Sequence, residues 1–153
     1  MSAFDLAQFN IATVLAPLDD PRMEGFVSRL AEINAVADNA PGFVWRLQTD
    51  DGDATALRPC GDDVVVNLSV WKDAASLKAF TYRAGHAELL RDRGKWFARA
   101  ASPTLVMWWV PAGHRPSVAE AIARLEDLRK NGPSPLAFDF RNFYPPPESG
   151  GNA

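Results

Sequence analysis

The sequence is short of the residues from which disulfides and metal centres are built. Its 153 residues include one cysteine, Cys60, and two histidines, His86 and His114. A single cysteine cannot form an internal disulfide, and two histidines without a carboxylate at short spacing do not make a metal-site pattern. Cys60 lies between Pro59 and Gly61 and has no base partner in the pattern, which argues against a nucleophilic cysteine. We therefore expect no metal site.

Signals for export, membranes and nucleic acids are also lacking. The first residues, MSAFDLAQFN, show no basic region followed by an apolar run, and no apolar run approaches the about 20 residues of a membrane span. The net charge of -3 leaves no basic excess to neutralise phosphates. No glycine-rich phosphate loop is present. We expect a cytoplasmic protein with no nucleic-acid or membrane partner.

What the sequence does have is enough apolar and aromatic material for one domain. The apolar fraction is 47% and the charged fraction 23%, with five tryptophans and nine phenylalanines. These aromatic residues fit either a large core or a pocket for a flat, apolar ligand, and both interpretations stay open. We expect a single domain over residues 1–144 and a disordered, Pro/Gly-rich tail over residues 145–153.

Two segments alternate between polar and apolar side chains and are therefore predicted strands: Phe4–Thr13 and Val64–Trp71. In each strand one face is aliphatic, and this is the face we expect to pack beneath helices. We also expect the two strands to be neighbours, so that Asn10 and Asn67 face one space. The opposite, polar face of the pair carries Gln8, Asn10, Asn67, Ser69 and Trp71.

The remaining pattern supplies two more strands and three helices. Strands are predicted at 42–49 and at 104–110, the latter buried on both faces because it is almost continuously apolar. Helices are predicted from Asp20-Pro21, from Asp73 and from the capping box that begins at Ser117. The second helix is expected to break near residue 85 and to resume through residue 96. The alternation at 136–140 is compatible with an added edge strand.

The order β-α-β-β-α-β is that of the ferredoxin-like split βαβ fold, an α+β architecture with an antiparallel sheet. We expect all helices to cover one face of this sheet. The other face, with its amides and Trp71, is too large and too aromatic to be left exposed to water. We therefore expect a second copy of the chain to cover it, forming a homodimer that encloses a hydrophobic pocket.

The candidate catalytic residues are a proton-transfer group and a pair of amides. His86 begins an apolar helical stripe, with Tyr82 four residues before it, and an imidazole can donate or accept a proton near neutral pH. Asn10 and Asn67 could donate amide N–H groups to a developing oxyanion. Each also has a purely structural alternative, a helix-start histidine or solvated amides. The predicted substrate-binding residues are Arg46, which could orient a carboxylate or phenolate, and Trp71, Trp45, Ser69, Gln8 and Trp96.

The phrase VNLSVWKDAASLKAF, together with the predicted element order, resembles the dimeric α+β barrel superfamily. This superfamily includes antibiotic-biosynthesis monooxygenases and haem-degrading monooxygenases. The likeness covers residues 4–110. The phrases LAQFNIA, PGFVWRLQ, YRAGHAELL and WWVPAGHRP are closer to a bacterial family of unknown function within it. The resemblance implies a dimeric barrel, and by similarity to the haem-degrading members it maps Asn10, Trp71 and His86 onto their functional Asn, Trp and His.

Three functions remain open at this stage. The first is an enzyme of secondary metabolism acting on a hydrophobic aromatic or polyketide-like molecule, either a cofactor-independent monooxygenase or an acid/base cyclase or isomerase. The second is a haem-binding or haem-degrading monooxygenase with His86 as axial ligand. The third is a non-enzymatic module that binds a small molecule. In the first case no cofactor is expected, and in the second the cofactor is haem.

Overall fold

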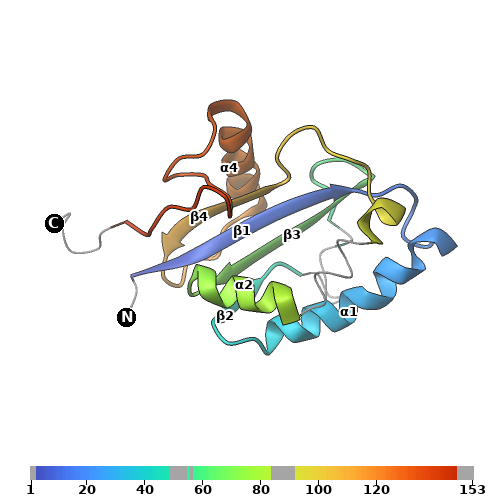
Figure 1. The fold of residues 1–153 in the computed structure, drawn as a ribbon, viewed down its shortest axis with the longest axis horizontal. Coiled ribbons are helices and arrows are strands. Elements are labelled where there is room, and N and C mark those ends of the chain that lie inside the picture. Colours follow the sequence, from blue (N-terminus) through green and yellow to red (C-terminus); the bar gives the residue numbers. More distant parts are fainter. Residues whose placement is uncertain (1–2, 49–54, 56, 84–91, 148–153) are drawn as a thin grey trace.

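A computed structural model describes residues 3–48, 55, 57–83 and 92–147. Within these ranges the chain forms β1 (Phe4–Thr13), α1 (Glu24–Asp38), β2 (Phe43–Arg46), β3 (Val64–Trp71), α2 (Ala74–Arg83), β4 (Leu105–Pro111) and α4 (Val118–Asn131), as Figure 1 shows. The four main predicted strands and the predicted helices form in these ranges, and β2 is shorter than the predicted 42–49. No helix in the described part of the chain is both long and apolar enough to cross a bilayer.

The sheet has the strand order β2-β3-β1-β4, and each neighbouring pair is antiparallel. This is the order of the ferredoxin-like fold, so the predicted α+β class and topology are confirmed. The two long strands β1 and β3 lie side by side at the centre. Their register places Asn10 directly opposite Asn67 and Gln8 opposite Ser69.

The helices begin where short polar side chains can accept hydrogen bonds from free backbone N–H groups. Asp20 Oδ1 accepts from Arg22 N at 2.9 Å and starts a short 3-10 turn, Pro21–Met23, ahead of α1. Asp73 Oδ1 accepts from Ser76 N at 2.8 Å at the start of α2. Ser117 Oγ accepts from Glu120 N at 3.1 Å at the start of α4. The three predicted helix starts are thus confirmed.

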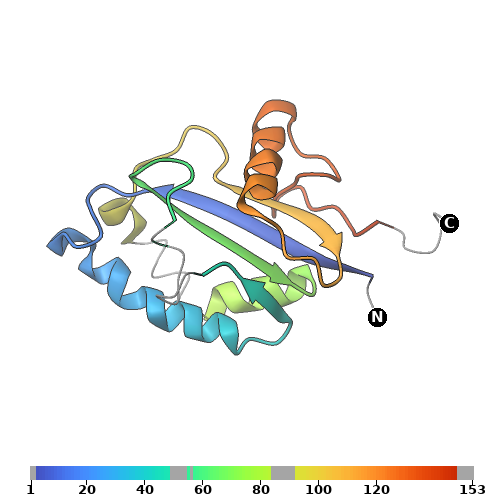
Figure 2. The same cartoon turned by 180° about the vertical axis from the view of Figure 1, so that it is seen from behind.

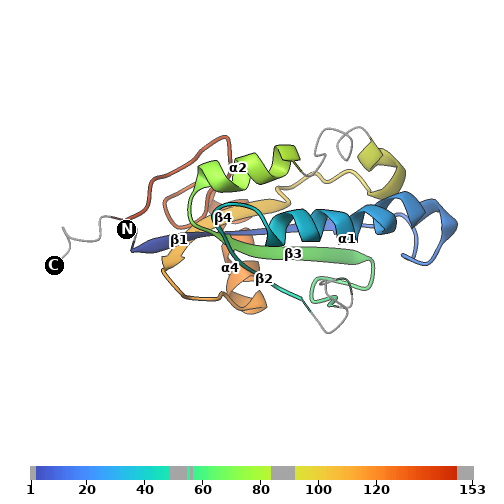
Figure 3. The same ribbon diagram turned by 90° about the horizontal axis from the view of Figure 1, so that it is seen from below.

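The helices lie on both faces of the sheet, which differs from the expectation of one covered face. Helices α1 and α2 lie on one side of the sheet and α4 on the other, as Figures 2 and 3 show. Leu125 of α4 packs with Phe9, Leu68 and Trp108 on the aliphatic face. The middle of that face is apolar in both central strands, so it needs a cover of its own, and the chain beyond β4 supplies one.

The face beneath α1 and α2 is the one that carries the amides and Trp71, the reverse of what we expected from the strand pattern. Trp71 is 0% exposed within a single chain. Its ring stacks on Phe80 of α2 at 5.0 Å and meets the edge of Phe43 at 5.3 Å. A second copy is therefore not needed to cover Trp71. Alternation shows which residues share a face, but the side on which a crossover helix lies depends on strand order and crossover handedness.

The chain after α4 returns to the face that α1 and α2 cover, alongside β4. Phe138 is 0% exposed and pairs with Met107 through backbone hydrogen bonds of 2.7 and 2.9 Å. Trp109 Nε1 donates to the carbonyl oxygen of Tyr144 at 2.9 Å. The strand expected at 136–140 is therefore an isolated bridge at Phe138, and β4 is buried on both faces as predicted.

Gly42, just before β2, lies very close to Ser76 of α2, and substitution tests how much this contact contributes to stability. Gly42 has a φ of +82°, and a Cβ added there would lie 2.1 Å from Ser76 Oγ. Gly113 has a φ of +89° but no atom within 4 Å of such a Cβ. We predict that Gly113→Ala lowers the free energy of unfolding by about 1–2 kcal/mol through backbone strain alone. Gly42→Ala should cost about 1–3 kcal/mol more because α2 must also move.

Urea unfolding of the two variants beside the unmodified protein measures both losses. Equal losses at the two glycines would show that the close approach of β2 to α2 has no energetic weight.

Candidate functional site

The polar side chains of β1 and β3 form one hydrogen-bonded cluster at the middle of the face that α1 and α2 cover. Gln8 is its centre: its Nε2 donates to Asn67 Oδ1 and, at 2.8 Å, to Ser69 Oγ. Gln8 Oε1 accepts from Asn10 Nδ2 at 2.9 Å, and that nitrogen also lies 3.4 Å from Asn67 Oδ1. Trp71 Nε1 donates to Ser69 Oγ at 2.9 Å. We call these five residues, Gln8, Asn10, Asn67, Ser69 and Trp71, the amide network.

The strand register explains why these side chains meet. Directly opposed residues of an antiparallel pair project from the same face, and every second residue of one strand does so too. Gln8 lies opposite Ser69 on one side and Met107 on the other, and Asn10 lies opposite Asn67. The prediction that the five polar-face residues share a face, with Asn10 and Asn67 facing one space, is confirmed.

Exposure changes steadily along the network, from Trp71 at its buried end to Asn67 at its open end. Trp71, Gln8 and Ser69 are 0%, 4% and 5% exposed, Asn10 is half-buried, and Asn67 is exposed. Asn67 belongs to a central strand on a face that helices cover, so its exposure shows that the helices do not close over the sheet there. The network therefore opens to solvent at Asn67.

Apolar clusters bound the network at both ends of the same face. One cluster contains Leu6, Trp71 and Leu77. The other contains Val65, Met23 and Trp96. A ligand lying along this face would therefore meet hydrogen-bonding groups in the middle and apolar side chains at either end, an arrangement typical of small-molecule sites.

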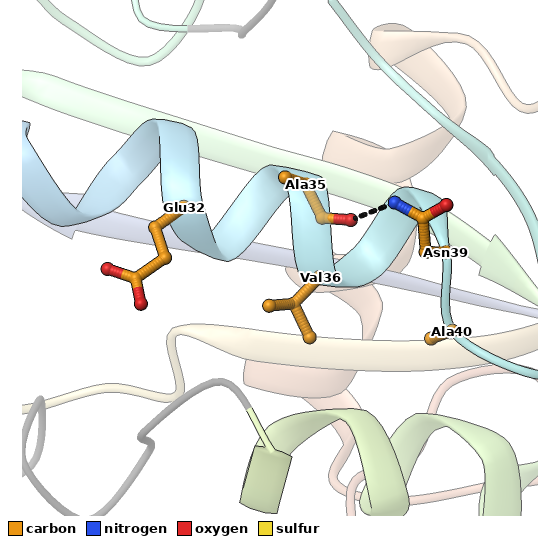
Figure 4. Close-up of a pocket in the computed structure, with 5 residues that line it drawn as sticks. All are labelled: Glu32, Ala35, Val36, Asn39 and Ala40. Atoms are coloured by element: carbon orange, nitrogen blue, oxygen red, sulfur yellow. Dashed lines mark hydrogen bonds between the residues drawn. The ribbon is translucent and has the colours of Figure 1, made fainter.

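An open groove of about 470 Å³ runs along α1, and Figure 4 shows the residues that line it. All five lining residues come from α1 and the turn after it: Glu32, Ala35, Val36, Asn39 and Ala40. Glu32 adds a carboxylate on the same helix. No residue of the amide network lines it among the described residues, so groove and network are separate features.

Arg46 lies opposite Ser69 in the sheet, but its side chain forms an ion pair with α1 and not a hydrogen bond with the amide network. Its Nε lies 2.8 Å from Asp38 Oδ1 and its Nη2 lies 3.2 Å from Asp38 Oδ2, a two-point ion pair. Arg46 is 8% exposed. The pair fixes β2 to the last turn of α1, and Asp38 was not among the predicted site residues. The role of Arg46 in orienting a substrate stays a prediction.

The other two predicted tryptophans lie away from the network. Trp45 pairs with Val70 and packs against the aliphatic face, so its prediction as a wall of the same pocket as Trp71 is wrong. The reason is the irregularity between Phe43 and Trp45, which puts Phe43 with Trp71 and Trp45 on the other side. Trp96 is 4% exposed and packs against Phe26 and Phe97 in the far apolar cluster.

Of the two predicted proton-transfer residues, only Tyr82 falls within the described part of the chain. Tyr82 belongs to α2, whose Phe80 stacks on Trp71. His86 lies outside the described residues. The roles of both residues in catalysis stay predictions, as do those of Asn10 and Asn67.

A second polar cluster on the side of α4 was missed at the sequence level. Glu120 Oε2 accepts from Trp108 Nε1 at 2.9 Å, and its Oε1 lies 2.8 Å from His114 Nε2. Partial burial raises the pKa of Glu120, but the hydrogen bonds from His114 and Trp108 lower it more, so its pKa lies below the ordinary value. The capping-box position of Glu120 was a signal, yet its carboxylate bonds to β4 and its loop instead of to the cap. This cluster ties β4 to α4.

Haem is the cofactor that the resemblance offers as an alternative, and the described residues do not fit it. His114 is the one histidine among them, and it is bonded to Glu120 beside α4. The indole of Trp71 is enclosed by Phe43 and Phe80. The described residues also hold no group of three or more His, Cys, Asp or Glu that could bind a metal ion. We derive no step through haem or a metal.

Comparisons with known proteins identify a family but no activity. A model of the family described as "Domain of unknown function (DUF3291)" matches residues 5–152. The expectation of a family of unknown function is thereby confirmed. No curated protein matches the sequence significantly.

Several solved structures are similar in fold. A protein of unknown function from Nitrosomonas europaea, NE2512, is 15% identical over 75% of this chain and 97% of its own, with a TM-score of 0.48. SnoaB, a cofactor-independent oxygenase from Streptomyces nogalater, is 19% identical over 77% and 100%, with a TM-score of 0.46. A candidate antibiotic biosynthesis monooxygenase from Chloroflexus aurantiacus is 12% identical over 74% and 98%, with a TM-score of 0.45. At these identities the likeness concerns the fold alone.

The Glu120 cluster predicts a pH-dependent contribution to stability. Because its pKa is lower in the folded chain than the ordinary 4.5, Glu120 stabilises the fold above that pH, and the contribution is lost as the pH falls through the folded-state value. We predict that Glu120→Gln lowers the free energy of unfolding at pH 7 by about 1 kcal/mol or less, and that the difference disappears towards pH 3.

Chemical denaturation between pH 3 and pH 7 tests this, with Glu126→Gln, an exposed glutamate of the same helix, as the control. A difference that stays constant over this range would contradict the assignment of the stabilisation to the ionised carboxylate.

Proposed function

Since the chain belongs to the family described as a domain of unknown function (DUF3291), we propose a function from its own site. The protein is a small-molecule enzyme that holds a hydrophobic, aromatic or polyketide-like substrate against the amide network. There it stabilises negative charge on a substrate oxygen. The observation that carries this proposal is Asn67, exposed in a central strand and hydrogen-bonded to a buried polar network beneath it.

The network supports charge stabilisation because its donors are oriented before a ligand arrives. Asn67 Oδ1 accepts from Gln8 Nε2 and faces Asn10 Nδ2 at 3.4 Å. Hydrogen bonds accepted by an amide oxygen polarise the amide and strengthen its N–H donors. Asn67 Nδ2 meets no acceptor among the described residues and lies at the open end. Fixed donors of this kind stabilise an oxyanion without reorganising during the reaction.

The side chains of the network are uncharged, which favours a substrate that is neutral when it binds. Neutral amides contribute little to holding a neutral carbonyl or phenol and more to holding the anion formed from it. Interactions that strengthen as the reaction proceeds raise the rate of the chemical step, and those equal in both states do not. The apolar clusters around Trp71 and Trp96 suit the uncharged remainder of such a substrate.

The proposed reaction starts with removal of a proton from a substrate carbon by His86, assisted by Tyr82, four residues earlier in the sequence. The resulting enolate has its charge on the oxygen at Asn67. Return of the proton to another carbon isomerises the substrate. In a cyclisation the enolate carbon instead attacks a second carbonyl carbon of the same substrate, and the proton goes to the alkoxide oxygen that this attack forms. Alternatively the enolate reduces O₂: a CH₂ group becomes C=O, one oxygen atom enters the product, and the other leaves as water. None of these courses needs a cofactor. We expect a homodimer, as the superfamily resemblance implies, and a cytoplasmic location, as the sequence pattern favours.

Oxygen consumption with an anthrone tests the proposed oxygenation. Dithranol is supplied without metal or cofactor, and the spontaneous rate is subtracted. We expect His86→Ala to lower kcat at least about 100-fold because it removes the base. Asn67→Ala should lower kcat about 100-fold because it removes an oxyanion donor. Asn131→Ala, which removes an amide on α4, should leave the rate unchanged.

Normal turnover by His86→Ala would contradict the central assignment. Binding of dithranol without turnover, weakened by Trp71→Ala but not by Asn67→Ala, would favour the non-enzymatic binding module instead.

A haemin titration separates the cofactor-free proposal from the haem alternative. We expect no sharp, saturable Soret band, because the indole of Trp71 is enclosed by Phe43 and Phe80 and leaves no face free for a porphyrin. The absorbance spectrum of the purified protein is followed as haemin is added, and the titration is repeated with His86→Ala. A saturable band that disappears in the variant would replace the proposal by a haem protein with His86 as its ligand.

A further inference from the structure

We propose that the hydroxyl of Ser69 is a second donor to the ligand, beside Asn67, and that Gln8 is the positioning residue that aims both. This inference rests on the proposed function only for the location of the ligand. It assigns a role to each member of the amide network from the hydrogen bonds they make. The ligand group it implies is an oxygen acceptor, a phenolate or enolate oxygen in its charged form.

The direction of the Ser69 hydroxyl follows from the two bonds it already accepts. A hydroxyl group has one hydrogen to donate and two lone pairs that accept. Trp71 Nε1 can only donate, and it donates to Ser69 Oγ at 2.9 Å. Gln8 Nε2 donates to the same oxygen at 2.8 Å. With both acceptor positions filled, the hydroxyl hydrogen must point towards the third position, away from Gln8 and Trp71.

That hydrogen has no acceptor among the described residues, although Ser69 is only 5% exposed. Buried donors in folded proteins are almost always paired, because leaving one unpaired forfeits its hydrogen bond to water. A ligand oxygen arriving at the third position would restore the missing bond. The hydrogen of this buried hydroxyl is thus the second sign, after the exposed Asn67, that a ligand acceptor belongs at this part of the sheet.

The two donors belong to alternate residues on one face of β3, and Gln8 is bonded to both side chains. Gln8 Nε2 contacts both Asn67 Oδ1 and Ser69 Oγ, so these two oxygens are no more than two hydrogen-bond lengths apart. Asn67 Nδ2 is bonded to the same amide carbon as Oδ1. Because one nitrogen holds both partners, a change at Gln8 should disturb both donors, whereas a change at either partner should disturb only one.

Asn10 takes a different role from the one predicted for it. Its Nδ2 donates to Gln8 Oε1 at 2.9 Å and lies 3.4 Å from Asn67 Oδ1. Both of its donor directions are therefore used inside the network. Asn10 orients Gln8, and it offers the ligand only its half-buried carbonyl oxygen. In this arrangement Asn67 and Ser69 donate to the ligand, while Gln8 and Asn10 are positioning residues.

The test uses 4-nitrophenol, whose phenolate absorbs in the visible range, as a probe of the purified full-length protein. Two donors aimed at its oxygen should lower the pKa of the bound phenol below that of the free probe. We expect Ser69→Ala to weaken phenolate binding about tenfold, which raises the bound pKa by about one unit, while binding of the neutral phenol at acid pH is unchanged. Asn67→Ala should act similarly.

The variants of the positioning residue and the controls sharpen the result. Gln8→Leu should raise the bound pKa by more than either single donor variant, because it releases both. Ser69→Thr retains the hydroxyl and should keep most of the effect, and Ser28→Ala, an exposed serine of α1, should change nothing. If Ser69→Ala fails to fold, as seen by near-UV circular dichroism, Ser69→Cys supplies a weaker donor and should give an intermediate pKa.

A bound pKa in Ser69→Ala or Ser69→Cys equal to that of the unmodified protein would overturn the inference. That outcome is expected if the amides of the network run in the opposite sense, with the carbonyl of Gln8 accepting from Ser69 and Asn67. Absence of saturable 4-nitrophenolate binding would overturn it as well. Failure of the proposed function can be told apart, because 4-nitrophenol reports the hydrogen-bond donors without turnover. If Ser69→Ala leaves the rate of dithranol oxidation unchanged, only this inference is removed.

Discussion

The hydrogen bonds from Gln8 to both Asn67 and Ser69 are the interaction on which the site depends. They cross from β1 to β3, so they join the two central strands through side chains as well as through the backbone ladder. A polar group buried at the middle of a sheet destabilises the fold unless it is fully paired. Gln8 meets this requirement with three partners. The same bonds that make its burial acceptable also leave the outward donors of its neighbours in fixed directions.

Contacts elsewhere in the fold support the hydrogen-bonded side chains of Gln8, Asn67 and Ser69. The stacking of Trp71 on Phe80 anchors α2 at one end of the face. The ion pair between Arg46 and Asp38 anchors the last turn of α1 to β2. The aliphatic side chains on the opposite face, with α4 against them, supply the apolar burial that stabilises the sheet. Stability and the proposed chemistry are thus carried by opposite faces of the same two strands.

The sequence was sufficient for the fold because alternation and helix caps are local signals. The strands and the helix starts at Asp20, Asp73 and Ser117 follow from such patterns. The strand order was predicted from the order of the elements, which is that of the ferredoxin-like fold. The grouping of the polar side chains followed from parity alone. The side of the sheet on which the helices lie did not, because it is a property of the assembled chain.

Long-range pairings were the other limit of prediction. The sequence around Arg46 does not predict its ion pair with Asp38. The sequence around Trp108 likewise does not predict its hydrogen bond to Glu120. Trp45 was placed wrongly because an irregularity in β2 breaks simple alternation. The roles of Asn10 and Ser69 could not be separated at all from composition, since they depend on which donor each oxygen meets.

The face-to-face register of Asn10 with Asn67 restricts how this protein can change over evolutionary time. Successive residues of a strand project to opposite faces, so inserting or deleting one residue within β1 would exchange Gln8 and Asn10 with Phe9 and Ile11. Amides would then enter the aliphatic core while large apolar side chains filled the site. Length variation among relatives should therefore be excluded from β1 and β3 and be confined to connections such as the one between β2 and β3.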